Sequence, residues 1–128
     1  MYSSDETSPK EFKEFQIRAD QGFPKSQYIM ADHYKNGIGV EKDRDRAKHY
    51  YKLLAEHNPS QLEFMNCTYA ELLYLIGLME FNDGKNGEAR KYFIRAKEYL
   101  EQNYPPPEYN RILENMEMDK YLELSSAC

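Results

Sequence analysis

The plainest structural signal in the chain lies in residues 19–51, which read ADQGFPKSQYIMADHYKNGIGVEKDRDRAKHYY. Pro24 suits the first position of a helix, because the N–H that proline lacks would have no partner there. The glycines of the Gly37-Ile38-Gly39 tripeptide adopt positive φ without steric cost, so they predict the end of that helix and a tight turn. Asp43 is a typical N-cap residue, worth about 1 kcal/mol, and a second helix is expected after it. The stretch therefore predicts a helical hairpin.

Helix signals also punctuate the rest of the chain. Ser8, Pro9 and Glu11 form a capping-box pattern at the start of a helix that Gly22 closes. The segment 60–81 carries two capping-box candidates, Ser60 with Glu63 and Thr68 with Glu71, which leaves open whether it is one helix or two. The expected helices cover residues 9–21, 24–36, 44–58, 60–81, 86–102 and 108–124.

Strands have little support in this composition. The chain holds a single valine, Val40, and two threonines, and no segment alternates polar and β-branched residues. Apolar residues instead recur at helical spacing, as in the 86–102 segment, where Ala89, Phe93 and Ala96 share one face. The expected fold class is all-α, with no sheet.

Two of the predicted hairpins share a spacing. In the first, an alanine at 47 is followed after four residues by Tyr51 and after seven by Leu54. In the second, Ala89 is followed at the same intervals by Phe93 and Ala96. Small residues allow two helices to approach closely, and an aromatic side chain one turn later fills the space beside them. The two hairpins are therefore repeats whose turns differ in length.

The first hairpin resembles a Sel1-like repeat, a variant of the tetratricopeptide repeat with a longer, glycine-containing turn. Its departures are mild: serine and alanine stand at 26 and 31, where alanine and glycine are usual, and methionine at 30, where leucine is usual. The second hairpin resembles a plain tetratricopeptide repeat but has Glu80 where an aromatic residue is usual. The residues that carry the resemblance are Ala19, Gly22, Ser26, Gln27, Tyr28, Met30, Ala31, Tyr34, Gly37, Gly39, Val40, Asp43, Ala47, Tyr50 and Tyr51, and then Gly77, Ala89, Phe93 and Ala96.

The resemblance implies an α-α superhelix of about two helical hairpins with flanking N- and C-terminal helices. On this basis residues 9–124 are expected to form a single helical-repeat domain between a flexible tail, 1–8, and a frayed tail, 125–128. Within the domain, repeat one is expected at about 19–57, repeat two at about 60–102 and a C-terminal helix at about 108–124. Hairpins of this kind bury their apolar faces by stacking on neighbours.

The same resemblance implies a non-enzymatic interaction module or adaptor that binds a protein or peptide on a concave face, formed by the first helix of each hairpin. Tyr74, Leu78 and Phe81 would form an apolar and aromatic strip there, of a kind that anchors peptides. The alternative is that the last helix covers this strip or that all three residues lie wholly in the core. The residues assigned to the face are Lys25, Tyr28, Asp32, Lys35, Asn36, Glu71, Tyr74, Leu78, Phe81 and Asn82.

Charge and hydropathy narrow the range of partners. The net charge is −5 with a pI near 5.2, which argues against a nucleic-acid or anionic-membrane binder. The longest apolar run, 72–79, is eight residues, far short of the roughly 18 needed to span a bilayer. With a polar N-terminus and two cysteines, the chain is expected to be soluble and cytoplasmic. So short a stack also exposes its ends, which allows a homodimer.

The distribution of charge supports an alternative function. The last 28 residues hold six acids and two cations, a net −4 of the total −5. The alternative is a small acidic inhibitor or immunity-type protein that neutralises one basic partner, because charge complementarity steers association. The cations Arg44, Arg46, Lys48 and Lys52 are expected to form a solvated face, or else a patch for an acidic partner.

No catalytic, metal or cofactor site is expected. The chain has no nucleotide-binding or hydrolase motif, and Gly37-Ile38-Gly39 is a turn element. His49 and His57 point about 80° apart on a helix, so the histidines are expected to be partly exposed polar residues rather than ligands. Cys67 is expected to be a small buried or half-buried residue. Of the three functions considered, a small hydrolase has the least support from the sequence.

Overall fold

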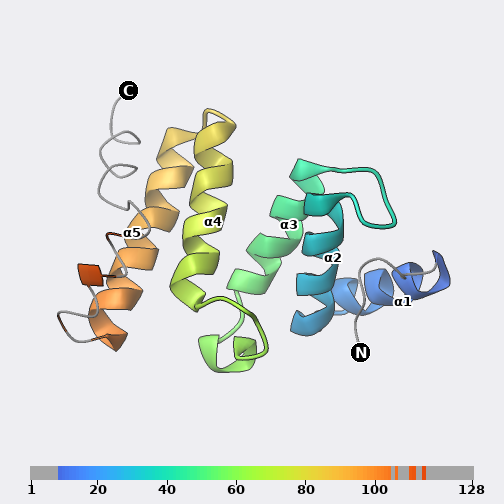
Figure 1. Cartoon of the computed structure of the whole chain (residues 1–128), viewed down its shortest axis with the longest axis horizontal. Helices are drawn as coiled ribbons and strands as arrows, with labels where there is room; N and C mark the ends of the chain where they lie inside the picture. Colours follow the sequence, from blue (N-terminus) through green and yellow to red (C-terminus); the bar gives the residue numbers. More distant parts are fainter. Residues whose placement is uncertain (1–8, 105, 107–109, 112–113, 115–128) are drawn as a thin grey trace. The chain divides into compact units, whose positions relative to one another are not determined.

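The computed structural model describes residues 9–104, 106, 110–111 and 114 (Figure 1). Every regular element among them is helical, so the all-α prediction is confirmed. The tails 1–8 and 125–128, the Ser8 cap, and all but three positions of the helix expected at 108–124 lie outside the described residues. The elements are α1 (Pro9–Asp20), α2 (Pro24–Asn36), α3 (Arg44–Ala55), the short 3-10 helix η2 (Pro59–Leu62), α4 (Tyr69–Asn82) and α5 (Asn86–Asn103).

The chain divides into two compact units, Met1–Met65 and Asn66–Cys128. In the first unit, α2 packs on α1 and runs antiparallel to α3 (Figure 1). In the second, α4 runs antiparallel to α5 (Figure 1). Each unit therefore contains one of the two expected hairpins.

The turn of the first hairpin is closed by backbone and cap bonds. Gly37 ends α2 in the left-handed conformation, with φ of 70°. The Asp43 amide donates to the Tyr34 carbonyl at 3.0 Å, which brings the two ends of the turn together. Asp43 then accepts the Arg46 amide at 3.0 Å and caps α3. The glycine and aspartate predicted to shape this turn do so.

The core of the first unit contains small and aromatic residues from the repeat pattern of the first hairpin. Ala31, Ala47 and Leu54 are fully buried, and Tyr51 is 2% exposed. Alanines at these positions let α2 and α3 approach closely, and the ring fills the remaining space.

A buried amide ties the three helical segments of this unit together. Gln27 is 3% exposed, and its amide nitrogen donates to the Ala19 carbonyl at the end of α1, at 3.1 Å. Its amide oxygen lies 2.8 Å from Nε2 of His57, just beyond α3, and accepts a hydrogen bond from that ring nitrogen. Because a buried amide is costly unless its bonds are made, Gln27 favours one arrangement of the three segments.

The second hairpin is built on one close approach. Gly77 of α4 faces α5, since a Cβ added there would lie 2.6 Å from Cε1 of the buried Phe93 ring. Leu72 and Met79 are also buried, although helical geometry turns them about 140° and 160° away from Gly77. The helix is therefore buried on more than one side, which explains why residues 72–79 are almost entirely apolar.

The helix expected at 60–81 is two pieces. The Thr68 and Glu71 capping box is present, and α4 begins at Tyr69. The Ser60 and Glu63 box is not the one that forms: the Asn58 side chain accepts the Ser60 amide at 3.1 Å and starts only the 3-10 turn η2. The side chain of Asn58 reaches this amide two residues on, and such a local bond favours a turn over a continuing helix.

Candidate interaction surfaces

The apolar strip expected on the second hairpin comprises Tyr74, Leu78 and Phe81. All three are half-buried, so they belong neither to the closed core nor to a fully solvated face. The Tyr74 ring packs against Phe93 of α5, with ring centroids 5.7 Å apart and tilted by 47°. Tyr74, at one end of the strip, is thus held against a buried ring of the core.

The ends of the strip are polar. Glu71 is exposed, but its carboxylate is used by the helix cap, where it accepts the Thr68 hydroxyl at 3.1 Å. Asn82 is exposed at the last residue of α4. A partner on this face would therefore meet an apolar centre between two polar ends.

The matching face of the first hairpin is more polar. Lys25, Lys35 and Asn36 are exposed, whereas Tyr28 and Asp32 are half-buried. These five residues have the same spacing along α2 as the five assigned residues have along α4, but three of them are charged. Equivalent positions of the two repeats therefore present different chemistry.

Two residues of the α2 face are engaged within their own unit. The Tyr51 hydroxyl of α3 donates to Oδ1 of Asp32 at 3.0 Å. The Tyr28 ring meets the Phe64 ring edge-on, with centroids 5.8 Å apart. Both contacts hold the unit together, so Lys25, Lys35 and Asn36 are the members of this face presented most fully to solvent.

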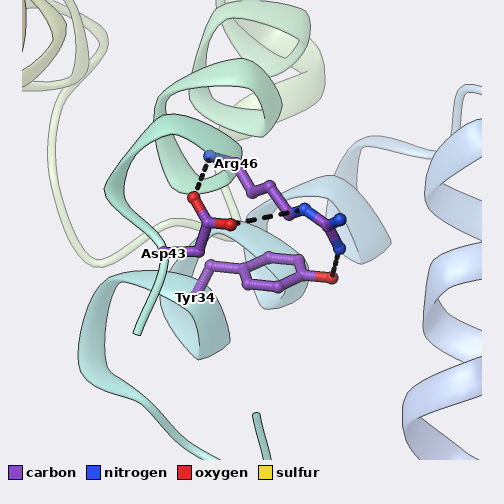
Figure 2. Close-up of polar contacts among 3 residues, drawn as sticks. All are labelled: Tyr34, Asp43 and Arg46. Atoms are coloured by element: carbon purple, nitrogen blue, oxygen red, sulfur yellow. Dashed lines mark hydrogen bonds and ion pairs between the residues drawn. The ribbon is translucent and has the colours of Figure 1, made fainter. Parts of the chain in front are cut away.

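A polar cluster stands at the glycine turn, where Tyr34 ends the core face of α2 and Arg46 rises from the first turn of α3 (Figure 2). The Arg46 guanidinium lies over the Tyr34 ring, 5.6 Å from its centroid, and donates to the Tyr34 hydroxyl at 3.2 Å. Nε of Arg46 also pairs with Oδ2 of Asp43 at 3.4 Å. The bond to Tyr34 and the nearby Asp43 charge raise the pKa of Arg46 above its ordinary value.

Behind this cluster, two of the buried tyrosines are stacked. The Tyr34 and Tyr50 rings are nearly parallel, at 5°, with centroids 6.1 Å apart. The Tyr50 hydroxyl donates to Oδ1 of Asp20 at the end of α1, at 3.1 Å. Burial, together with this bond to a carboxylate, raises the pKa of Tyr50 to about 12.

Two polar side chains are buried where the sequence predicted exposure. His33 is fully buried, with Nδ1 2.7 Å from the Ile29 carbonyl and the Phe12 and Phe15 rings beside it. Lys48, expected on a solvated face, is only 8% exposed. The prediction was wrong for both residues because helical spacing alone does not show which surfaces α1 and the other segments cover.

Other expectations concern chemistry. Cys67 is half-buried, as expected. Among the described residues, no group of three or more His, Cys, Asp or Glu side chains is arranged to hold a metal ion. None of the helices that the structure describes has the length and hydropathy needed to cross a bilayer.

The structure also adds residues that sequence reasoning did not assign to a surface. Phe64 follows η2 and joins the α2 face by its contact with Tyr28, although it is distant in sequence from α2. Arg46 was grouped with its neighbouring cations, and only the geometry separates it from them. Its one sequence signal is its place three residues after the Asp43 cap, where a side chain can fold back over the turn.

Comparison with known families agrees with this architecture. The family model of the Sel1 repeat matches residues 24–59 and 69–101. The first match contains α2 and α3 with the glycine turn, and the second covers most of α4 and α5. No solved structure matches the chain. The matched segments span more than half of the sequence, and the chain therefore belongs to the Sel1 repeat family.

Proposed function

We propose that this protein is an adaptor that binds a partner polypeptide on the concave face expected from the first helix of each hairpin, with the strip on α4 as the main contact. Sel1 repeats are generally protein–protein interaction modules, and the family is generally non-enzymatic. The observation that carries the proposal is the half-buried row Tyr74, Leu78 and Phe81. At protein interfaces a few well-packed residues, often aromatic ones such as tyrosine, provide most of the binding energy.

The faces on α4 and α2 are expected to contribute differently to binding, because their side chains differ. On α4, removal of the apolar strip from water by a partner stabilises the complex by about 25 cal/mol per Å² of apolar surface. On α2, Lys25 and Lys35 are exposed cations, which contribute more to orientation and association rate than to affinity. Substitutions on α4 should therefore weaken binding, and substitutions on α2 should mainly change its dependence on salt.

A photo-crosslinking experiment tests the proposal. A benzoylphenylalanine replaces Leu78 in one variant and Ile94 in a control, since Ile94 is 36% exposed on α5. A partner captured at position 78 but not at position 94 is identified, purified and titrated against the Leu78→Ala and Ile94→Ala variants. We expect Leu78→Ala to weaken binding by about tenfold or more, as for a central interface residue, and Ile94→Ala to leave it unchanged.

The proposal fails if the purified partner binds both alanine variants with the affinity of the original chain. Circular dichroism of each variant shows whether its helices are retained, so that a loss of binding is not confused with a loss of folding.

An acidic inhibitor of one basic partner is the second candidate. The observation in its favour is the net −4 carried by residues 101–128. This function predicts tight 1:1 binding that weakens steeply as salt is added, because the attraction comes from exposed charges. Binding that Leu78→Ala abolishes and salt barely changes would favour the adaptor.

A further inference from the structure

The glycine turn of the first hairpin borders a cavity that has no part in the proposed function. Its volume is about 460 Å³, within the range of roughly 300–1,000 Å³ found for small-ligand pockets. It opens between the turn and the first turn of α3. Its lining residues are Tyr34, Val40, Glu41, Lys42, Asp43 and Arg46.

Arg46 is held in place at this cavity before any ligand arrives. The Tyr34 hydroxyl takes one N–H of its terminal nitrogen, the Tyr34 ring lies beneath its guanidinium, and Asp43 pairs with Nε (Figure 2). A guanidinium has five N–H donors, so these contacts leave three for another acceptor. The side chain is nonetheless 64% exposed, so a ligand in the cavity can reach it.

The charges of the lining point to the class of ligand. Asp43 is already committed, since Oδ1 accepts the Arg46 amide and Oδ2 faces Nε of Arg46. Lys42 adds a second cation to the rim and Glu41 adds one carboxylate. A carboxylate suits the planar guanidinium fork, and a neighbouring peptide N–H suits Glu41. Glu41 repels an inorganic dianion more strongly than a singly charged carboxylate, because the dianion carries twice the charge.

We infer that this cavity binds a carboxylate of a polypeptide, with Arg46 as the main donor and Lys42 as the second cation. Because Tyr34 and Asp43 already fix the guanidinium, little conformational entropy is lost when the carboxylate binds. The carboxylate belongs to an acidic side chain or to a chain terminus, which offer the same chemistry to Arg46. The site holds or fails independently of the strip on α4.

The test is a titration of the full chain with three defined peptides, followed by ¹⁵N–¹H correlation spectra that include the Arg46 Nε–H. One peptide is a tripeptide of glutamate blocked at both ends. The second is an N-acetylated tripeptide of alanine with a free terminal carboxylate, and the third is the same peptide as its C-terminal amide. Inorganic phosphate is the fourth probe. We expect saturable shifts at residues 37–46 with the first or the second peptide, and the responding one identifies the source of the carboxylate.

Matched variants separate a site from a general charge effect. Arg46→Gln and Arg44→Gln remove the same charge from the first turn of α3, but only Arg46 lines the cavity. We expect Arg46→Gln to weaken binding by about tenfold or more, as for a lost charged hydrogen bond, and Arg44→Gln to leave it within about twofold. Lys42 takes no part in the contacts of Arg46 with Tyr34 and Asp43. Lys42→Gln should therefore weaken binding and leave the fold unchanged.

Four outcomes would overturn the inference. The first is that neither carboxylate peptide shifts the signals of residues 37–46, and the second is that the amidated peptide shifts them equally. The third is that both arginine variants weaken binding equally, and the fourth is that phosphate binds more tightly than the peptides. If Arg46→Gln disturbs the turn, seen as altered spectra without peptide, the Lys42→Gln result decides: unchanged binding in that variant refutes the site.

Discussion

Replacing Gly77 with alanine should destabilise the second hairpin, although alanine is the better helix former. The added Cβ would lie 2.6 Å from Cε1 and 2.7 Å from Cδ1 of Phe93, where carbon atoms prefer a separation of about 3.5–4.0 Å. Phe93 is fully buried, so its ring must move by about 1 Å into a packed core. Overpacking of this kind costs about 1–3 kcal/mol.

The gain in helix propensity opposes this cost. Glycine inside a helix is about 0.5–1 kcal/mol less favourable than alanine. The two ranges combine to roughly 0–2.5 kcal/mol, so we expect Gly77→Ala to lower the free energy of unfolding by about 1 kcal/mol. Urea unfolding followed by circular dichroism at 222 nm measures the difference.

Gly87→Ala is the matched control. Gly87 lies in α5, and a Cβ added there would meet no atom within 4 Å. The control should therefore be neutral or stabilise the chain by up to about 1 kcal/mol. Adding Phe93→Leu to Gly77→Ala should cost less than the sum of the two single changes, because the smaller side chain relieves the overlap.

The reasoning is refuted if Gly77→Ala unfolds at the same urea concentration as the original chain, or at a higher one. It is also refuted if Gly87→Ala is destabilised equally, since steric overlap at Phe93 would then not be the cause.

Three further predictions concern caps and buried polar groups. Thr68→Ala should cost about 1 kcal/mol and speed hydrogen exchange in the first turn of α4, because the capping box is lost; unchanged exchange there would contradict the cap. Tyr50 should ionise near pH 12 in ¹³Cζ-tyrosine spectra, and Asp20→Asn should lower that value. Since the folded pKa of Tyr50 is raised above the unfolded value, its stabilisation is complete below about pH 10 and is lost as the pH rises towards 12; a midpoint near 10 in the original chain would be inconsistent with the buried bond. Gln27→Leu should cost about 1–3 kcal/mol in urea unfolding, because the Ala19 carbonyl loses its donor, whereas the same change at the exposed Gln21 should have little effect; equal effects would rule out the buried network.

The sequence predicted helices best where a local signal stands at each end. The helix α2 runs from Pro24 to Asn36, as expected, because proline fixes the start and Gly37 supplies the left-handed residue after the end. The helix α5 begins at Asn86 and extends to Asn103, one residue beyond the prediction. These signals act within a few residues and need no knowledge of the tertiary structure.

Competing local signals were harder to resolve. Both Ser60 and Thr68 head capping-box patterns, and only the second one starts a long helix. The first pattern loses because the Asn58 side chain captures the Ser60 amide and a short 3-10 turn forms instead. The choice between the two depends on a side-chain bond that spacing alone does not specify.

Burial of polar groups required the tertiary structure. His33 lies on α2 among residues of mixed polarity, and it is buried because the Phe12 and Phe15 rings of α1 cover it. The position of Arg46 over Tyr34 likewise depends on how the glycine turn brings α2 and α3 together. The sequence named the residues of the candidate strip, but the contact of Tyr74 with Phe93 and its half-buried state come from the packing of α4 on α5.

The pairing of each first helix with its second helix is tested most directly by a nuclear Overhauser experiment on the isotopically labelled chain. Gly77 Hα should show a cross-peak to the Phe93 ring, since these groups are in van der Waals contact. In the first hairpin, the matching peak should join the Ala31 methyl to the ring of Tyr51, whose hydroxyl reaches the neighbouring Asp32. If both residue pairs give no cross-peak while the helices are intact, the two hairpins do not exist as described.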